Sequence, residues 1–253
     1  MAALQRKRKE SKQTKSAKAL LRYEIAKSLD DMQLIGLQRS GKIVLKKIGK
    51  GLEFNVFDLG NGRVLKKPTT KRQKRKFFRQ WYPNETKAVQ EKRLYRAEKS
   101  TQYSLRNLSR HVLKAFPTLL GNPLFLKNLQ YTQDKVQPLG KYFKSHTFSE
   151  NKLILHSYTN CIFQQWEAGF FQKVSNFTIN YGVDAKGKVI LMDLGELTFS
   201  KAEVASRIKK KTWLANWSYL KMKDKKLKRY YARLLDAELT LEKLNRLWKA
   251  HKQ

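Results

Sequence analysis

The sequence has little cysteine, few acidic residues and no long apolar run, and each shortage excludes a class of protein. Its one cysteine, Cys161, cannot form an intrachain disulfide, and no Cys/His spacing typical of a metal site occurs. No apolar stretch approaches the roughly 20 residues of a membrane span, and the N-terminus has no signal-peptide apolar core. We therefore expect an intracellular protein, located in the cytoplasm.

Basic residues greatly outnumber acidic ones. The 253 residues include 55 Lys and Arg against 20 Asp and Glu, a formal net charge of +35. Such a charge exceeds what solubility requires and indicates an anionic partner: a phosphorylated ligand, nucleic acid or an acidic membrane surface. Because 41% of the residues are hydrophobic and 11% aromatic, we expect most of the chain to fold.

The stretch 173–196 contains the clearest candidate site. An apolar run over 189–192 predicts a buried strand that ends at Asp193, and the alternating residues 180–183 predict a strand paired with it as a hairpin. The hairpin would bring Asn180 at its start close to Asp193 at its end. An amide oxygen and a carboxylate are hard ligands suited to Mg²⁺, which completes its shell with water and substrate phosphates.

These residues resemble a family. Asn180, a hairpin and then Asp193-Leu194-Gly195 are similar to the catalytic-loop Asn and the Asp-Phe-Gly metal motif of the protein-kinase superfamily. The resemblance implies that Asn180 and Asp193 hold Mg²⁺ and that Asp193 is catalytic. Kinases place a catalytic Asp five residues before that Asn, where this chain has Ser175. Ser175 or Asn176 would then orient an acceptor hydroxyl, or there would be no acceptor.

A glycine-containing turn and a lysine upstream extend the resemblance. Gly49 and Gly51 connect the first two predicted strands, as in the kinase Gly-rich loop, where glycines let backbone N–H groups approach phosphates. Lys66 lies on the third strand, in the place of the kinase Lys that holds the α- and β-phosphates, while Lys67 points to the opposite face. The three strands are predicted over 43–48, 54–59 and 63–67.

A helix downstream offers a partner for that lysine. We expect Asn84 to cap a helix running to about Ser100, and we assign its mid-helix Glu91 to pair with Lys66. The alternative for Glu91 is a surface partner at i,i+4 spacing. The preceding segment 71–82, basic and aromatic, is either a nucleic-acid-binding surface or a linker whose aromatics pack on the small lobe.

Further elements follow from periodicity and turn signals. Strands are expected over 124–126 and 130–136, an interlobe hinge over 137–140, and a broadly buried helix over 149–171. A basic helical segment over 101–116 should stop before Pro117. The predicted organisation is a basic disordered arm over 1–16, a helix over 17–40, an N-lobe over 41–137 and a helical C-lobe over 138–253.

Three details resemble a narrower group, the small bacterial PhoP regulatory network protein YrbL family. They are Ser175, the pair Gly195-Glu196, and the pattern T-W-x-x-x-W that begins at Thr212. The resemblance covers roughly residues 43–231. It implies an α+β, protein-kinase-like two-lobed fold with a small antiparallel-sheet N-lobe and a reduced helical C-lobe.

Alternative functions remain open at this point. The first is a kinase-like protein that binds ATP and Mg²⁺ and transfers phosphate to an unknown acceptor. In that case ATP with Mg²⁺ should protect the protein against thermal unfolding, and Asp193→Ala should remove this protection. The second is a pseudokinase scaffold that binds nucleic acid or another anionic partner, with an affinity that falls steeply between about 50 and 200 mM salt. The third is a sugar kinase acting at a lipid surface, which should associate with acidic liposomes.

Overall fold

The computed structural model describes residues 31–33, 35–36, 44–173 and 176–249. The chain divides into two compact units, 1–47 and 48–253. In the first unit, residues 31–33 and 35–36 are helical; the rest of the helix expected over 17–40 and the basic arm over 1–16 lie outside the described residues. None of the helices that the structure describes is both long and apolar enough to cross a bilayer.

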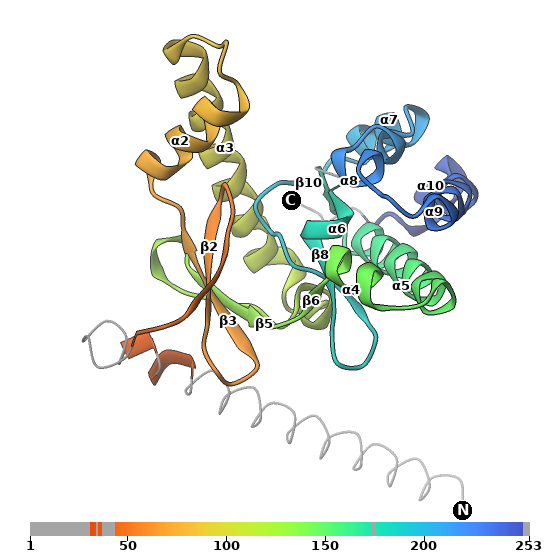
Figure 1. The fold of residues 1–253 in the computed structure, drawn as a ribbon, viewed down its shortest axis with the longest axis horizontal. Coiled ribbons are helices and arrows are strands. Elements are labelled where there is room, and N and C mark those ends of the chain that lie inside the picture. Colours follow the sequence, from red (N-terminus) through yellow and green to blue (C-terminus); the bar gives the residue numbers. More distant parts are fainter. Residues whose placement is uncertain (1–30, 34, 37–43, 174–175, 250–253) are drawn as a thin grey trace, which may run out of the picture. The chain divides into compact units, whose positions relative to one another are not determined.

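The second unit begins with a five-stranded sheet in the order β1-β2-β3-β5-β4 (Figure 1). Strands β2, β3, β5 and β4 pair antiparallel, and the tight β2–β3 turn places Gly60 and Gly62 at positive φ. The expected strands are therefore present, with ends shifted by a few residues. They are β1 Lys47–Lys50, β2 Phe54–Asp58, β3 Arg63–Pro68, β4 Leu124–Phe125 and β5 Tyr131–Asp134.

Two helices are inserted between β3 and β4. The segment expected as a nucleic-acid surface or a linker is helix α2, Lys71–Trp81, which starts in a capping box formed by Thr70 and Gln73. The expected cap at Asn84 is wrong: helix α3, Lys87–Asn107, begins after Thr86, whose hydroxyl accepts the Val89 N–H. Helix α3 continues into a π-helical turn, Leu108–Val112, and the helical path ends before Pro117 as predicted.

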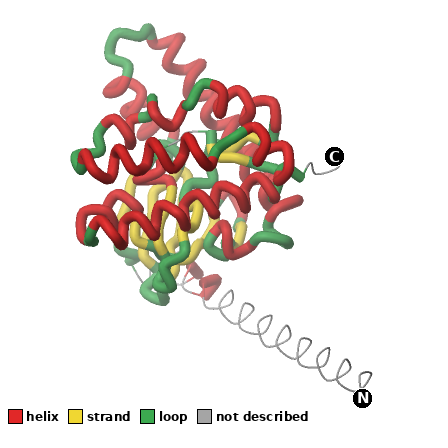
Figure 2. Tube along the Cα trace, turned by 90° about the vertical axis from the view of Figure 1, so that its right-hand side faces the viewer, coloured by secondary structure: helices red, strands yellow, loops and turns green. Residues whose placement is uncertain are grey.

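The remainder of the unit is mainly helical, and Figure 2 shows the strands partly hidden behind helices. Its long central helix α5, Phe148–Glu167, starts in a capping box of Thr147 and Glu150. The helix stops short of the predicted residue 171 because Gly169 takes a left-handed φ, after which the chain enters a strand. The other helices are α4 Leu139–Ser145, α6 Phe177–Asn180, α7 Lys201–Lys209, α8 Trp217–Leu220, α9 Lys225–Glu238 and α10 Leu241–Leu247.

Two small sheets lie among these helices. Strand β8, Tyr181–Val183, pairs with both β6, Gln137–Pro138, and β9, Val189–Leu191. Strand β7, Phe171–Gln172, pairs with β10, Leu197–Thr198. The expected hinge over 137–140 therefore consists of strand β6 and the start of α4, which lead the chain from the first sheet into the helical part.

Stacked aromatic rings form much of the core of the helical part. Phe177 and Tyr231 stack with their centroids 4.4 Å apart, and Tyr158 meets Tyr181 edge-on at 4.9 Å. All four rings are almost fully buried. The short helix α6 is thereby fixed against α5 and α9, which positions the hairpin that follows it.

The fold is α+β, as predicted: a small antiparallel sheet is followed by a reduced, mainly helical part. The lobe boundary at 137/138 stays a prediction.

Candidate functional site

The β8–β9 hairpin brings Asn180 and Asp193 together. Asn180 is the last residue of α6, not the first of a strand as expected. Its backbone carbonyl accepts the N–H groups of Met192 at 2.8 Å and of Asp193 at 3.2 Å. The two predicted metal-binding residues therefore lie next to each other in space, although they are separated by a hairpin in the sequence.

The Asp193 side chain is held by its own loop. Its carboxylate accepts the Gly195 N–H at 3.0 Å, and its backbone carbonyl accepts the Gln172 side-chain amide at 3.2 Å. Gln172 lies on β7, so the pairing of β7 with β10 on the other side of the loop supports this arrangement. The Asp193 carboxylate is thus oriented by a hydrogen bond within its own loop, and the Asp193 backbone is held by Gln172.

Lys66 reaches this loop from strand β3. Its ammonium group donates to the Met192 carbonyl and lies 5.4 Å from the centre of the Tyr131 ring. Burial lowers the pKa of Lys66 to about 8, and the negative charge of Asp193 acts in the opposite direction. The neighbouring Lys67 lies over Phe57 instead. Of the two lysines, Lys66 is therefore the one directed at the Asp193 loop.

The glycine turn has a different conformation from the one that a phosphate-binding loop requires. The Gly51 N–H donates to the Phe54 carbonyl at 2.8 Å and so closes the turn. Thr69, at the end of β3, holds the tip through two bonds, one to the Glu53 carbonyl at 2.8 Å and one to the Gly51 carbonyl at 3.0 Å. A side chain on Gly49 would come within 3.3 Å of Val56. In this structure the Gly51 N–H is therefore engaged within the turn.

Glu53 is the residue that sequence reasoning missed. The closed turn directs its side chain into the site, where it is only 9% exposed. Burial, followed by the charges of Asp193 and Glu196, raises the pKa of Glu53 to about 8. The pKa of Glu196 is also raised, first by burial and then by Asp193. The carboxyl groups of Glu53, Asp193 and Glu196 thus lie close enough to influence one another's ionisation.

The structure does not bring Glu91 to Lys66, so that assignment is corrected. Glu91 lies on α3, but its carboxylate accepts two bonds from Arg75 of α2, at 2.6 and 3.1 Å, and is 38% exposed. This hydrogen bond lowers the pKa of Glu91. The mid-helix position faces α2 because α2, which was not expected to be a helix, packs along that side of α3.

The remaining predicted residues lie before α6. Ser175 is outside the described residues. Asn176 precedes the helix, and its backbone carbonyl accepts the Ile179 N–H at 3.1 Å and the Asn180 N–H at 2.9 Å. Asn176 is therefore tied by its backbone to Asn180, and its role towards an acceptor stays a prediction.

The site supplies too few oxygen ligands to hold a hard cation by itself. No group of three or more His, Cys, Asp or Glu side chains in the described part of the chain is arranged to hold a metal ion. Mg²⁺ is commonly held by one or two carboxylates together with substrate phosphates. Asn180 and Asp193 are consistent with a site in which the protein supplies few ligands and substrate phosphates supply the others.

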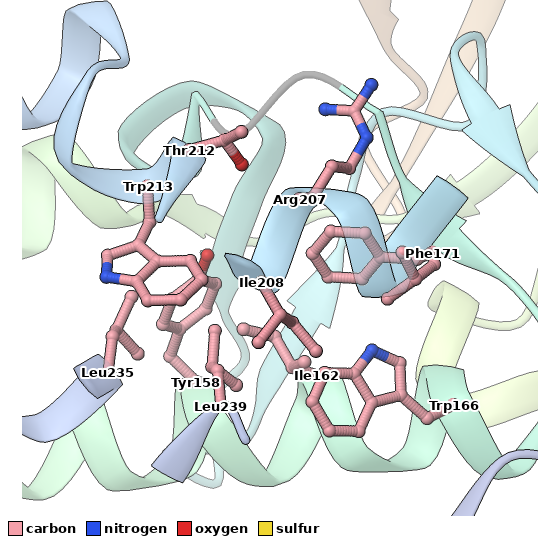
Figure 3. Close-up of a pocket in the computed structure, with 11 residues that line it drawn as sticks. Tyr158, Ile162, Trp166, Phe171, Arg207, Ile208, Thr212, Trp213, Leu235 and Leu239 are labelled. Atoms are coloured by element: carbon pink, nitrogen blue, oxygen red, sulfur yellow. The ribbon is translucent and has the colours of Figure 1, made fainter. Parts of the chain in front are cut away.

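A separate cavity lies between α5, α7 and α9 (Figure 3). Its walls are mostly apolar, with Tyr158, Ile162, Trp166, Ile208 and Trp213 among them. Its volume of about 10 Å³ leaves room for about one water molecule. We interpret it as a packing defect of the core and not as a ligand site.

Comparisons with known proteins found similar folds but no family. No protein-family model and no curated protein matches the sequence. Among solved structures, one of the bifunctional kinase-methyltransferase WbdD is 18% identical, with a TM-score of 0.40, and covers 83% of this chain and 48% of that chain. A second WbdD structure is 16% identical with a TM-score of 0.41 over the same shares. A co-crystal of WbdD with a kinase inhibitor is 18% identical with a TM-score of 0.36, and covers 81% of this chain and 46% of that chain.

The chain therefore spans about half the length of the WbdD chains that it resembles. The narrower resemblance to the YrbL family stays a prediction.

Proposed function

We propose that this kinase-like chain binds ATP with Mg²⁺ and transfers the terminal phosphoryl group to an acceptor. The observation that supports the proposal is the buried Lys66 of β3, which meets the Met192–Asp193 segment 126 residues further along the chain. A buried lysine next to a carboxylate is an arrangement that costs desolvation energy. An anionic ligand with a divalent cation would compensate that cost.

The residues present fit the proposed ligands. Lys66 would hold nucleotide phosphates, and Asn180 and Asp193 would hold Mg²⁺. When bound, Mg²⁺ supplies charge neutralisation for the transferring phosphoryl group, on which this chemistry chiefly depends. A general base contributes a smaller factor of about 10²–10⁴, so Ser175 in place of an Asp weakens transfer without removing nucleotide binding.

The glycine turn must open for this role. In the closed turn the Gly51 N–H is bonded to Phe54, and the Glu53 carboxyl lies where it would face the phosphates. The phosphates would add negative charge beside Glu53 and so disfavour its ionised form, and nucleotide binding would displace the Glu53 side chain or place a cation between it and the phosphates. Opening the turn breaks the Gly51–Phe54 bond and frees backbone N–H groups near Gly49 and Gly51 for the phosphates.

Thermal unfolding with and without ATP and Mg²⁺ tests nucleotide binding. Ligand at about a hundred times its dissociation constant adds about 2.7 kcal/mol, which raises the midpoint by several degrees. We expect this shift in the wild type, and we expect Asp193→Ala and Lys66→Met to lose it. Asp236→Ala serves as the control, because Asp236 forms an exposed ion pair with Lys211 away from the site.

Phosphoryl transfer is tested separately, by following release or transfer of the terminal phosphate from labelled ATP. A thermal shift without any turnover would leave a nucleotide-binding pseudokinase, which is the non-catalytic alternative. Absence of a shift at every ATP concentration would overturn the proposed function.

A further inference from the structure

Helices α2 and α3 form a helical hairpin next to the sheet (Figure 1), which we call the basic hairpin and define as residues 71–99. The two helices run antiparallel, as shown by side-chain pairs between Lys74 and Glu98 and between Arg75 and Glu91. The hairpin contains eleven Lys and Arg residues but only three Glu. It is therefore one of the most positively charged parts of the chain that the structure describes.

All three glutamates are already neutralised by bases of the same hairpin. Glu85 accepts from Arg93 at 2.7 Å, and Glu91 from Arg75 at 2.6 Å. Glu98 lies 3.5 Å from the Lys74 ammonium. The eight other bases have no ion pair with an acidic group in the described residues, so the excess charge of the hairpin is presented outward.

Helix α2 carries this charge at the expense of its own stability. Lys71 and Arg75, Arg72 and Lys76, and Arg75 and Arg79 are like-charged neighbours at i,i+4 spacing. The first turn contains bases and no acidic residue, although the helix dipole favours negative charge there. Lys71, Arg72, Lys76 and Arg79 are all exposed. An anionic partner along this face would relieve the repulsion.

Two large aromatic residues mark the end of α2. Trp81 is 54% exposed and Tyr82 is 37% exposed, and both precede the turn into α3. Only one of the segment's four aromatic residues, Phe78, is buried, so the segment does not match the alternative of a linker whose aromatics pack on the small lobe. Exposed Trp and Tyr beside Lys and Arg are typical of surfaces that lie at the lipid headgroup level.

The ring faces do not favour stacking with nucleobases. The Arg93 guanidinium lies 4.3 Å from the centre of the Tyr82 ring, and Phe78 stacks on that ring at 6.3 Å. The rings of Phe77 and Trp81 contact each other at 5.4 Å, and the Lys50 ammonium lies 5.0 Å from the Phe77 centre. Single-stranded nucleic acids bind proteins through a positively charged groove and through stacking of bases on aromatic faces, and the face of Tyr82 is already occupied by Arg93.

We propose that the basic hairpin binds the surface of an anionic phospholipid bilayer. The α2 face contacts headgroup phosphates through Lys71, Arg72, Lys76 and Arg79, and Trp81 and Tyr82 reach the headgroup level from the C-terminal end of the helix, not from that face. This binding depends on neither Lys66 nor Asp193. It is therefore independent of the proposed nucleotide site.

The test is co-sedimentation of the full chain with phospholipid vesicles. We expect binding to vesicles with about one-third phosphatidylserine and little binding to pure phosphatidylcholine vesicles. Each basic residue near such a surface contributes about a fivefold factor in partitioning, so Arg72→Gln/Lys76→Gln/Arg79→Gln should weaken binding about a hundredfold. The matched control removes three exposed charges elsewhere, Lys209→Gln/Lys210→Gln/Lys223→Gln, and should change binding much less.

Tryptophan fluorescence locates the contact. On binding vesicles, the emission should shift to shorter wavelength, and Trp81→Phe should remove most of that shift. Trp217, which is 57% exposed on α8, gives the control: Trp217→Phe should retain it. Circular dichroism of each variant checks that α2 is still helical.

Several results would overturn the proposal. One is equal binding of the hairpin and control triple variants to anionic vesicles, which would indicate a non-specific effect of the total charge. Another is absence of vesicle binding together with tight binding of RNA or DNA that the hairpin triple variant weakens, which would make nucleic acid the partner. Asp193→Ala should bind vesicles like the wild type whether or not the nucleotide proposal holds.

Discussion

The Glu53 side chain lies directly against Gly195. A Cβ atom at position 195 would come within 2.8 Å of the Glu53 Cγ and within 3.3 Å of the Asp193 carboxylate. Gly195, two residues after Asp193, therefore gives space to an acidic side chain from the turn between β1 and β2. This contact joins the tip of the N-lobe sheet to the loop that carries Asp193.

Replacing Gly195 by Ala should be costly only while Glu53 is present. The new methyl group meets the Glu53 side chain, and overpacking of this kind typically costs about 1–3 kcal/mol. We expect Gly195→Ala to lower the free energy of unfolding by that amount. In a Glu53→Ala background, the same replacement should lower the free energy of unfolding much less. A double-mutant cycle measured by urea unfolding gives the coupling. Equal costs in both backgrounds would mean that the two residues do not touch.

Glu53→Gln should stabilise the metal-free protein at alkaline pH. The folded state keeps the Glu53 proton up to a pKa of about 8, whereas the unfolded chain loses it near 4.5. Between these values the folded state binds more protons, so wild-type stability falls as the pH rises through this window. The neutral glutamine has no such dependence, and its stability advantage over the wild type should reach on the order of 5 kcal/mol above pH 8.

This dependence is measured by chemical unfolding from pH 4.5 to 9 in the presence of a chelator. The two proteins should have similar stabilities at the acidic end and diverge towards the alkaline end. Parallel curves would show that Glu53 ionises normally and is not confined with Asp193 and Glu196.

Arg63 should be among the most sensitive positions of the N-lobe. It is 2% exposed and donates to Asp134 at 2.8 Å, to the Thr132 hydroxyl at 2.6 Å and to the Asn122 carbonyl at 2.9 Å. Removing one partner of a buried ion pair typically costs about 3–5 kcal/mol. We expect Arg63→Met to lower the free energy of unfolding by about this amount, as measured with urea.

The exposed ion pair between Lys135 and Asp58 provides a control for that experiment, because its lysine is 47% exposed. Lys135→Met should cost less than about 1 kcal/mol. A small effect of Arg63→Met would imply that the arginine and its partners reorganise easily.

Glu91→Gln should leave nucleotide binding unchanged. Its carboxylate pairs with Arg75 on the surface, where solvent screens the pair and its contribution to stability is small. We expect the ATP–Mg²⁺ shift in the unfolding midpoint to be the same in the variant as in the wild type. Loss of the shift would return Glu91 to the role of partner for Lys66 and would require α3 to rotate in the nucleotide-bound state.

Much of the fold could be predicted because its signals are local. The Gly60-Asn61-Gly62 turn fixed the β2–β3 hairpin, and an apolar periodicity fixed α5. Helix α2 was missed because its first six residues contain no apolar side chain, and Phe77, Phe78 and Trp81 come only in its second half. Its start could have been found, since Thr70 and Gln73 have the Thr-x-x-Gln spacing of a capping box.

In the candidate site, only the residues that the hairpin brings together could be predicted from the sequence. Asn180 and Asp193 meet because β8 and β9 pair, and an alternating pattern is enough to predict such pairing. The choice of Glu91 depended on the rotation of α3 about its axis, which is set by packing against α2. Glu53 depended on the bonds from Thr69 that fold the turn inward, and no short-range pattern encodes them.

The bond from Lys66 to the Met192 carbonyl also has a consequence for the order of folding. It joins residues 126 positions apart, and contacts of such long sequence separation form late because a large loop must first close. During synthesis, strands β2 and β3 can pair long before residue 192 leaves the ribosome, and a ligand of the site has nothing to bind at that stage. Any such ligand can therefore protect the finished protein from unfolding and degradation, but it cannot assist the newly made chain.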